Sequence, residues 1–276
     1  MLEAYIAERK KQSDLLLMTH IVIGYPSLAA SLEIVDAMVE AGVDLMELQV
    51  PFSEPIADGP VILKANQESL RSGIRVDDCF RFAETVCARH AIPFLFMGYY
   101  NTLVARGVDA FVARAKSSGL RGAIVPDLPP EEGAEYLSAM QRHSLDPIFI
   151  FSPNSPDERM QEVAKYARGF VYCVARKGVT GSKTQFSDDS DRDFGSVPIG
   201  DVTSLGRWFW REGKNRSRTP AWQGRHRRHW FGEYSRRGQP WGFCGWAVHP
   251  WTSGVRYQPG AQRSSTNSTR RAKPRL

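Results

Sequence analysis

The 276-residue sequence has no apolar run long enough to cross a bilayer and no signal-peptide pattern at its N-terminus. It contains only four cysteines, at positions 79, 87, 173 and 244, and no two of them have CxxC spacing. This pattern indicates neither a zinc site nor a disulfide framework. Because 42% of the residues are hydrophobic, the chain can bury a core of the size found in barrel proteins. We therefore expect a cytoplasmic protein with one globular domain.

Tryptophan is absent from the first 193 residues, and all seven tryptophans of the chain follow Phe194. The charge changes at the same point. Residues 194–276 hold 14 Arg and 2 Lys against three acidic residues, a net charge of +13, whereas residues 1–193 carry −7. We therefore divide the chain into a folded portion, residues 1–193, and a basic, Trp/Arg-rich segment, residues 194–276.

Up to this break, short apolar runs alternate with segments of helical periodicity. The runs predict strands at residues 15–23, 43–48, 92–97, 122–125, 147–151 and 169–174, and the segments between them predict helices. Six strand–helix units favour a parallel α/β fold, with a (β/α)8 barrel as the leading interpretation. A doubly wound sheet is the alternative, but no G-x-G-x-x-G follows the first strand.

The stretch from Val43 to Pro60, VDLMELQVPFSEPIADGP, combines a buried strand with an acidic loop. Glu47 stands near the end of the strand, and Glu54 and Asp58 lie on a loop that its prolines prevent from being helical. A carboxyl group at the end of an apolar strand, with a second one on a rigid loop, suits acid–base chemistry. The alternative is an ordinary strand followed by a solvated acidic loop.

The run ELQVPFSEPIADGP resembles the signature of the tryptophan synthase alpha chain family, E-(L/I)-G-(I/V)-P-F-S-D-P-x-A-D-G-P. Two positions depart from it: Gln49 replaces the usual Gly, and Glu54 replaces the usual Asp. The blocks G-Y-P, Y-x-N, P-D-L-P, S-P-N and A-R-x-G-V-T-G also match the family. The resemblance covers residues ~1–193 and implies a TIM barrel with its active face at the carboxyl ends of the strands.

The resemblance implies a lyase of tryptophan biosynthesis that cleaves indole-3-glycerol phosphate to indole and glyceraldehyde 3-phosphate. It makes Glu47 the catalytic acid–base group and Asp58 the partner of the indole N–H. The substrate-binding residues that it implies are Tyr99, Asp127, Tyr172, Thr180 and Gly181. Thr180 and Gly181 belong to residues 176–185, which we interpret as a lid that closes over the substrate.

The resemblance also implies that this half-reaction needs no metal or organic cofactor. The expected partner is a tryptophan synthase beta chain, which uses pyridoxal phosphate and receives the indole, in an alpha2-beta2 heterotetramer. The surface expected to meet it includes the Asp58 loop, Tyr100 and Asn101. We expect no membrane or nucleic-acid partner.

Residues 194–276 lack the two further strand–helix units, with a G-F-G turn and a later G-S, that the family uses to bind phosphate. The codons of Trp208, Phe209 and Trp210, read one base later, encode glycine, phenylalanine or serine, and glycine. The same shift allows a Gly-Ser pair at Trp230 and Phe231. The simplest explanation is a frameshift near codon 194, in the gene or in its sequencing.

Under this hypothesis the last ~80 residues supply no regular seventh and eighth strands, are disordered, and leave the chain inactive as written. Three alternatives remain. The segment is a nucleic-acid-binding appendage, since arginines with interleaved aromatics suit phosphate contacts and base stacking. The chain is a non-catalytic barrel fragment that still binds the beta chain. The third, another phosphosugar barrel enzyme, is disfavoured by the specific signature run.

Overall fold

The computed structural model describes residues 2–13, 15–152, 155–174, 205–208 and 244–248. The strands are β1 (Leu16–Val22), β2 (Leu45–Gln49), β3 (Phe94–Met97), β4 (Gly122–Ile124), β5 (Asp146–Phe151), β6 (Val171–Val174), β7 (Leu205–Trp208) and β8 (Cys244–Val248). The α-helices are α1 (Leu2–Lys10), α2 (Leu28–Glu40), α3 (Pro60–Arg71), α4 (Val76–Arg89), α5 (Tyr100–Val104), α6 (Val108–Ser117), α7 (Ala134–Arg142) and α8 (Asp157–Ala164). A 3-10 turn, η1 (Pro130–Glu132), precedes α7.

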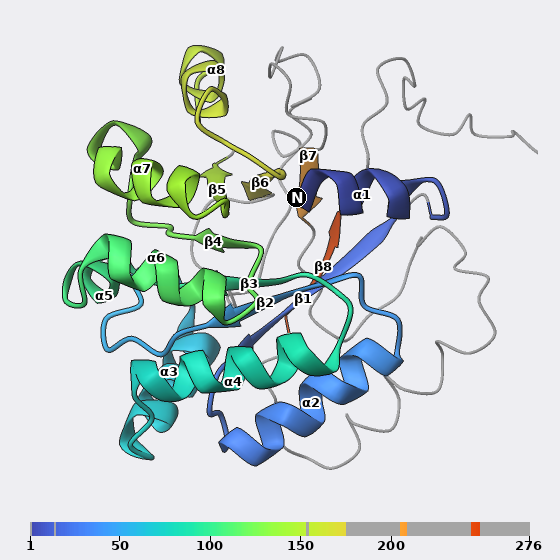
Figure 1. Ribbon diagram of the computed structural model, residues 1–276, viewed down its shortest axis with the longest axis vertical. Coiled ribbons are helices and arrows are strands. Elements are labelled where there is room, and N and C mark those ends of the chain that lie inside the picture. The colour runs from blue at the N-terminus through green and yellow to red at the C-terminus, as the bar shows by residue number, and fades with distance from the viewer. Residues whose placement is uncertain (1, 14, 153–154, 175–204, 209–243, 249–276) are drawn as a thin grey trace, which may run out of the picture.

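Strands β1 to β6 pair in parallel with their sequence neighbours and form a half-barrel (Figure 1). Helices follow the strands and cover one face of this sheet, as the right-handed βα crossover requires. The predicted α/β fold with six parallel strands is therefore confirmed. The carboxyl ends of the six strands point to the same rim, where barrel enzymes place their catalytic groups.

Two short strands flank the six, and they correct one prediction. β7 pairs in parallel with β6, and β8 pairs with β1 in antiparallel orientation, so the sheet order is β7-β6-β5-β4-β3-β2-β1-β8. The expectation that the last ~80 residues supply no regular seventh and eighth strands is therefore wrong for β7, which extends the parallel sheet. The backbone groups at the open edges of β1 and β6 pair with almost any extended segment, because ladder bonds need no particular side chains. An eighth barrel strand would run parallel to β1, which β8 does not.

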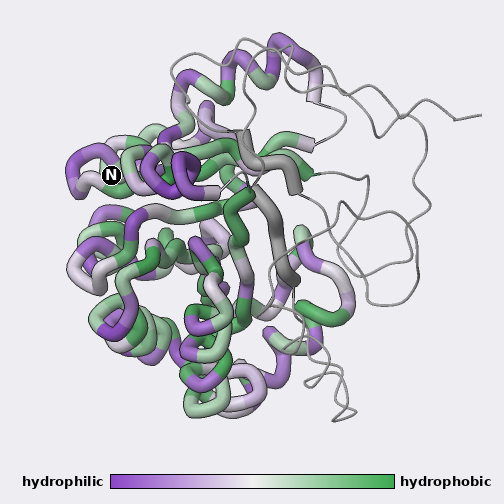
Figure 2. Tube along the Cα trace, turned by 90° about the vertical axis from the view of Figure 1, so that its right-hand side faces the viewer, coloured by the Kyte–Doolittle hydropathy of each residue, from purple (hydrophilic) through white to green (hydrophobic). Residues whose placement is uncertain are grey.

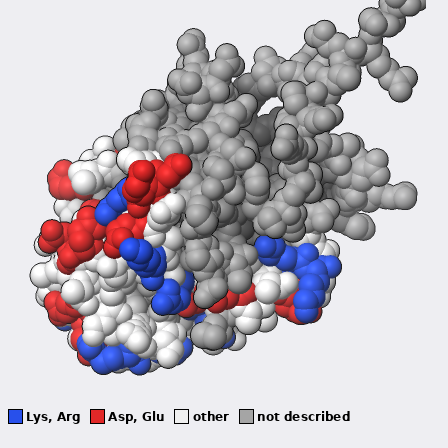
Figure 3. All heavy atoms as spheres, turned by 90° about the horizontal axis from the view of Figure 1, so that it is seen from above, with Lys and Arg blue, Asp and Glu red and all other residues white. Residues whose placement is uncertain are grey.

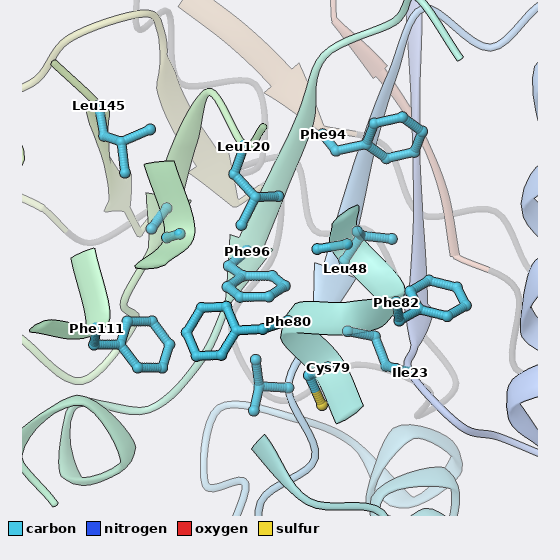
Figure 4. Close-up of a cluster of buried hydrophobic side chains, with 14 of the residues drawn as sticks. Ile23, Leu48, Cys79, Phe80, Phe82, Phe94, Phe96, Phe111, Leu120 and Leu145 are labelled. Atoms are coloured by element: carbon cyan, nitrogen blue, oxygen red, sulfur yellow. The ribbon is translucent and has the colours of Figure 1, made fainter. Parts of the chain in front are cut away.

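The buried hydrophobic residues form two clusters. On its helix-covered face, Phe80 of α4 packs against Phe96 of β3, with ring centroids 5.4 Å apart, and against Phe111 of α6 at 5.0 Å (Figure 4). The other cluster includes Met18 and Leu45 on the opposite face of β1 and β2, residues of α1, and residues of α8, β5 and β6, where it takes in side chains from both faces of the sheet. Hydrophobic residues concentrate in the strands, whereas the helices carry both hydrophobic and hydrophilic residues (Figure 2).

Most predicted elements lie within a few residues of their expected positions, with two differences. The helix predicted after Pro130 is interrupted at Gly133, so a 3-10 turn precedes α7. The Tyr100-Asn101 segment, for which the sequence predicted no helix of its own, begins the short helix α5. A five-residue helix is too short to show the apolar period on which sequence prediction depends.

Helix α1 closes the end of the half-barrel opposite the catalytic rim. The backbone N–H of Leu2 donates to Asp146 at the start of β5 (3.0 Å), and Gly169, just before β6, donates to Glu3 (3.1 Å). Arg9 donates to the buried carboxylate of Asp44 (Nε–Oδ1 3.0 Å). Other ion pairs lie on the surface, where Figure 3 shows acidic and basic side chains next to one another on the described part of one face. None of the helices in the described ranges is long and apolar enough to span a membrane.

Candidate active site

Strand β2 turns Glu47 toward the face of the sheet that the helices leave open. Successive side chains of a strand alternate between faces, so Leu45, Glu47 and Gln49 share a face. Leu45 belongs to the cluster on the open face, whereas Met46 and Leu48 belong to the cluster under the helices. Glu47 is next to the end of β2, and both acidic groups of the predicted pair therefore lie at the catalytic rim.

Glu47 is buried, with 5% of its surface exposed. Burial penalises its ionised form and, together with the negative charge of Asp58, raises the pKa of the Glu47 carboxyl to about 8. The group is therefore mostly protonated at neutral pH. A carboxylic acid that keeps its proton at pH 7 can act as a general acid, and its conjugate base can then act as a general base.

Asp58 lies on the loop between β2 and α3, and two side chains donate hydrogen bonds to its Oδ2 atom. The amide Nε2 of Gln49 donates at 2.7 Å and the hydroxyl of Tyr99 at 3.1 Å. Burial raises the pKa of the Asp58 carboxyl above its usual value, and the two hydrogen bonds offset only part of that rise. In the described part of the chain, no donor approaches the other carboxylate oxygen, Oδ1, so that Oδ1 can accept a bond from a substrate N–H.

Tyr99 fixes the loop that carries Asp58. Its ring is buried and stacks on Phe52 with centroids 4.9 Å apart, and its hydroxyl also accepts the backbone N–H of Ala57 at 3.0 Å. At the start of the loop, the backbone N–H of Phe52 donates to the side chain of buried Asn66 on α3 (2.9 Å). The loop ends where Gly59 caps α3 and Pro60 occupies its first turn.

The other predicted site residues are spread around the rim. Tyr172, on β6, is buried in the open-face cluster. Asp127 is exposed after β4, and its carboxylate accepts the backbone N–H of Tyr100 at the first turn of α5 (2.9 Å). Thr180 and Gly181, with the predicted lid, lie outside the described residues. Glu54 is exposed on the Asp58 loop.

Sequence reasoning missed the contribution of two buried polar residues. His20 of β1 lies beside Glu47 in the strand register, and its Nε2 atom is 2.8 Å from Oε1 of Gln49. Burial lowers the pKa of His20 to about 4, so the ring is neutral. The departure at Gln49 was visible in the sequence, but its partners were not. Among the described residues, no group of three or more His, Cys, Asp or Glu side chains could hold a metal ion.

The chain is similar to known proteins over the same region. The family model of the tryptophan synthase alpha chain matches residues 6–197, which ends close to the break at residue 194. The alpha chain of Syntrophotalea carbinolica is 63% identical over 187 residues, covering 68% of this chain and 74% of that protein. The alpha chain of Desulforapulum autotrophicum is 61% identical over 189 residues, covering 68% and 75%.

Solved structures agree with these matches. Mycobacterium tuberculosis tryptophan synthase superimposes with a TM-score of 0.67 at 34% identity, covering 74% of this chain and 78% of that one. Tryptophan synthase subunit alpha from Legionella pneumophila superimposes with a TM-score of 0.60 at 32% identity, covering 63% and 66%. The signature around Glu47, the parallel half-barrel and these matches show that the chain belongs to the tryptophan synthase alpha chain family, the lyases that cleave indole-3-glycerol phosphate in tryptophan biosynthesis.

Proposed function

We propose that Glu47 and Asp58 are the acid–base pair with which this chain cleaves indole-3-glycerol phosphate. One observation carries the proposal: Glu47 is a buried carboxyl group with a pKa of about 8, beside a second carboxyl group that two hydrogen bonds favour in its ionised form. The hydrogen bonds to Asp58 favour its ionised form against the effect of burial, and we take Asp58 as the counter-charge to protonated Glu47.

The reaction follows from these two states. Protonated Glu47 gives its proton to C3 of the indole, and the ring nitrogen then carries positive charge. Asp58 accepts the indole N–H and balances that charge. The C3–C1′ bond breaks, its electron pair returns to the ring to re-form indole, and the C1′ hydroxyl becomes the aldehyde of glyceraldehyde 3-phosphate as its proton leaves. Ionised Glu47 is the base available to take that proton.

The remaining assignments place the substrate. Tyr99 and Tyr172 line the indole site, Tyr99 also holding Asp58. Asp127 keeps α5 against the rim through the backbone of Tyr100. Thr180 and Gly181 close over the bound substrate, with Thr180 directed toward the Asp58 loop. These roles come from the family motifs and from the positions of the described residues at one rim.

The proposed partner is a tryptophan synthase beta chain with bound pyridoxal phosphate, in an alpha2-beta2 complex. The Asp58 loop offers a contact surface, because Ile56 on this loop exposes 74% of its surface. Tyr100 and Asn101 of α5 lie at the same rim.

Indole release from indole-3-glycerol phosphate, with and without a beta chain, tests the proposal. It is measured on the 276-residue chain and on a chain whose frame is restored near codon 194. In whichever chain is active, Glu47→Gln should lower kcat by ~10²-fold or more, because glutamine has no transferable proton. Glu54→Gln, a change at an exposed position of the Asp58 loop, is the control. Near-normal turnover of the Glu47 variant would remove Glu47 from the mechanism.

A further inference from the structure

A continuous line of hydrogen bonds connects β1 to the Asp58 loop through the interior of the protein. His20 contacts Gln49 at 2.8 Å, and Gln49 contacts Asp58 at 2.7 Å. His20 and Gln49 expose 5% and 0% of their surfaces, so water does not compete for these bonds. The family pattern has glycine at position 49, which could form neither contact.

The direction of each bond follows from the chemistry of Asp58. Its carboxylate only accepts hydrogen bonds, so the side chain of Gln49 must turn its NH2 group toward Asp58. The carbonyl oxygen of Gln49 then faces His20, and Nε2 of His20 must carry the ring proton. The opposite amide orientation would place two acceptors against each other and leave both buried. His20 therefore fixes which end of the Gln49 amide reaches Asp58.

The two donors to Asp58 also set the position of Oδ1, the carboxylate oxygen that they do not contact. Gln49 and Tyr99 approach Oδ2 from two different strands, β2 and the end of β3, and both donate to that oxygen. Two donors on one oxygen restrict rotation of the carboxylate about its last torsion. Oδ1 is thereby held away from the protein donors in the described residues. Of the charged and titratable neighbours, Glu47 and His20 are partners in the strand register, and Tyr99 lies between β3 and α5.

We propose that Gln49 and His20 are positioning residues for Asp58: His20 fixes the Gln49 amide, and Gln49 holds the carboxylate so that Oδ1 meets the indole N–H. The role in the reaction rests on the proposed function, but the hydrogen-bonded line does not. Replacement of the family glycine by glutamine thus adds a second support for the catalytic aspartate, beside Tyr99. The glutamine needs a donor behind it, and His20 supplies one.

The first test needs no substitution. Nitrogen-15 NMR of the full-length chain, labelled at histidine and assigned through the backbone of His20, reports which ring nitrogen carries the proton. The proposal requires a neutral ring protonated at Nε2. A ring protonated at Nδ1, or a charged ring at neutral pH, would overturn it, because Gln49 would then be free to turn the other way.

The second test measures Asp58 directly, through carbon-13 NMR of its side-chain carboxyl during a pH titration. Gln49→Met keeps the length of the side chain but cannot donate. It should raise the apparent pKa of Asp58 by about 1–2 units, because a hydrogen bond to a charged group contributes about 1.5–3 kcal/mol. Thr19→Val is the matched control on β1. Among the described residues, Thr19 Oγ1 has no hydrogen-bond partner, so this change should leave the titration in place.

An unchanged Asp58 titration in Gln49→Met would refute the positioning role, whatever the activity. A shifted titration combined with unchanged turnover in an active chain would keep the positioning role and refute the part of Asp58 in the reaction. The two proposals therefore fail separately. Neither NMR measurement requires turnover, so both decide the question on the 276-residue chain itself.

Discussion

Replacing Glu47 by glutamine should stabilise the protein at neutral and alkaline pH, although it removes the proposed catalytic acid. Burial and the charge of Asp58 raise the pKa of the Glu47 carboxyl from 4.5 to about 8. A raised pKa means that the folded protein holds this proton more tightly than the unfolded chain does. Below about pH 4.5, Glu47 is protonated in both the folded and the unfolded protein, so its raised pKa does not change the free energy of unfolding. Above about pH 4.5 the unfolded chain loses this proton and the folded protein does not, so the free energy of unfolding falls as the pH rises.

The size of the effect follows from the shift. Between about pH 4.5 and pH 8, the free energy of unfolding of the natural protein should fall by about 1.4 kcal/mol per pH unit relative to Glu47→Gln. The difference should reach about 3 kcal/mol at pH 7 and about 4–5 kcal/mol above pH 8, where it levels off. Such a gain is large against a typical total stability of about 5–15 kcal/mol.

Urea unfolding followed by circular dichroism, repeated across this pH range, measures the difference. Glu54→Gln is the matched control, because it removes a carboxyl group at an exposed position of the Asp58 loop, which follows β2. It should change the free energy of unfolding by no more than about 0.5 kcal/mol at any pH. If the two glutamine variants gave parallel pH profiles, Glu47 would be ionised in the folded protein, and its assignment as the acid would have to be abandoned.

Three further predictions follow from other parts of the molecule. Tyr99→Phe should cost about 1–3 kcal/mol in urea unfolding and impair cleavage, because it removes one of the two donors to Asp58 and leaves the N–H of Ala57 without its acceptor. Tyr136→Phe, which removes a buried hydroxyl that donates to the backbone of Ala123, should spare activity; equal activities would contradict this. Gly24→Ala should lower the melting temperature more than Gly73→Ala does, as measured by thermal unfolding. Both glycines have positive φ, but only at Gly24 would an added Cβ lie 2.6 Å from Ile74 and 2.8 Å from Ser69. Deleting one base near codon 194 should raise kcat/KM for indole-3-glycerol phosphate by at least ~10²-fold, because the phosphate would regain its binding groups; a 276-residue chain with comparable activity would refute the frameshift hypothesis.

The sequence was sufficient to predict the six parallel strands because each has a short apolar run, and four of the runs are closed within a few residues by Gly24, Pro51, Gly98 or Pro126. It also placed Glu47 and Asp58 at one rim, since parallel strands share their carboxyl ends. Local patterns could not show that a tail strand would pair with β1 in reverse, because backbone pairing at a sheet edge leaves no pattern in the side chains. The frameshift and the activity of the chain stay predictions.

The environment of Asp58 was also beyond the sequence. Gln49 could be recognised as a departure from the family pattern, but its partner His20 is 29 positions away in the sequence. Tyr99, the second donor to Asp58, is 41 positions from that residue. Such distant pairs are set by the strand register, and one sequence contains no trace of which residues the register will bring together. The same holds for Asp127, whose contact with the first turn of α5 depends on a helix too short to predict.

The contacts of α1 impose an order on folding. Helix α1 is synthesised before its hydrogen-bond partners near residues 44, 146 and 169, so its two buried side chains, Leu2 and Ile6, have no site until most of the half-barrel has been synthesised. Contacts this distant along the chain are the slowest to form. Helix α1 therefore docks late, after β5 and β6 have joined the sheet. A nascent chain that stops before residue 146 would leave this helix exposed to chaperones and proteases.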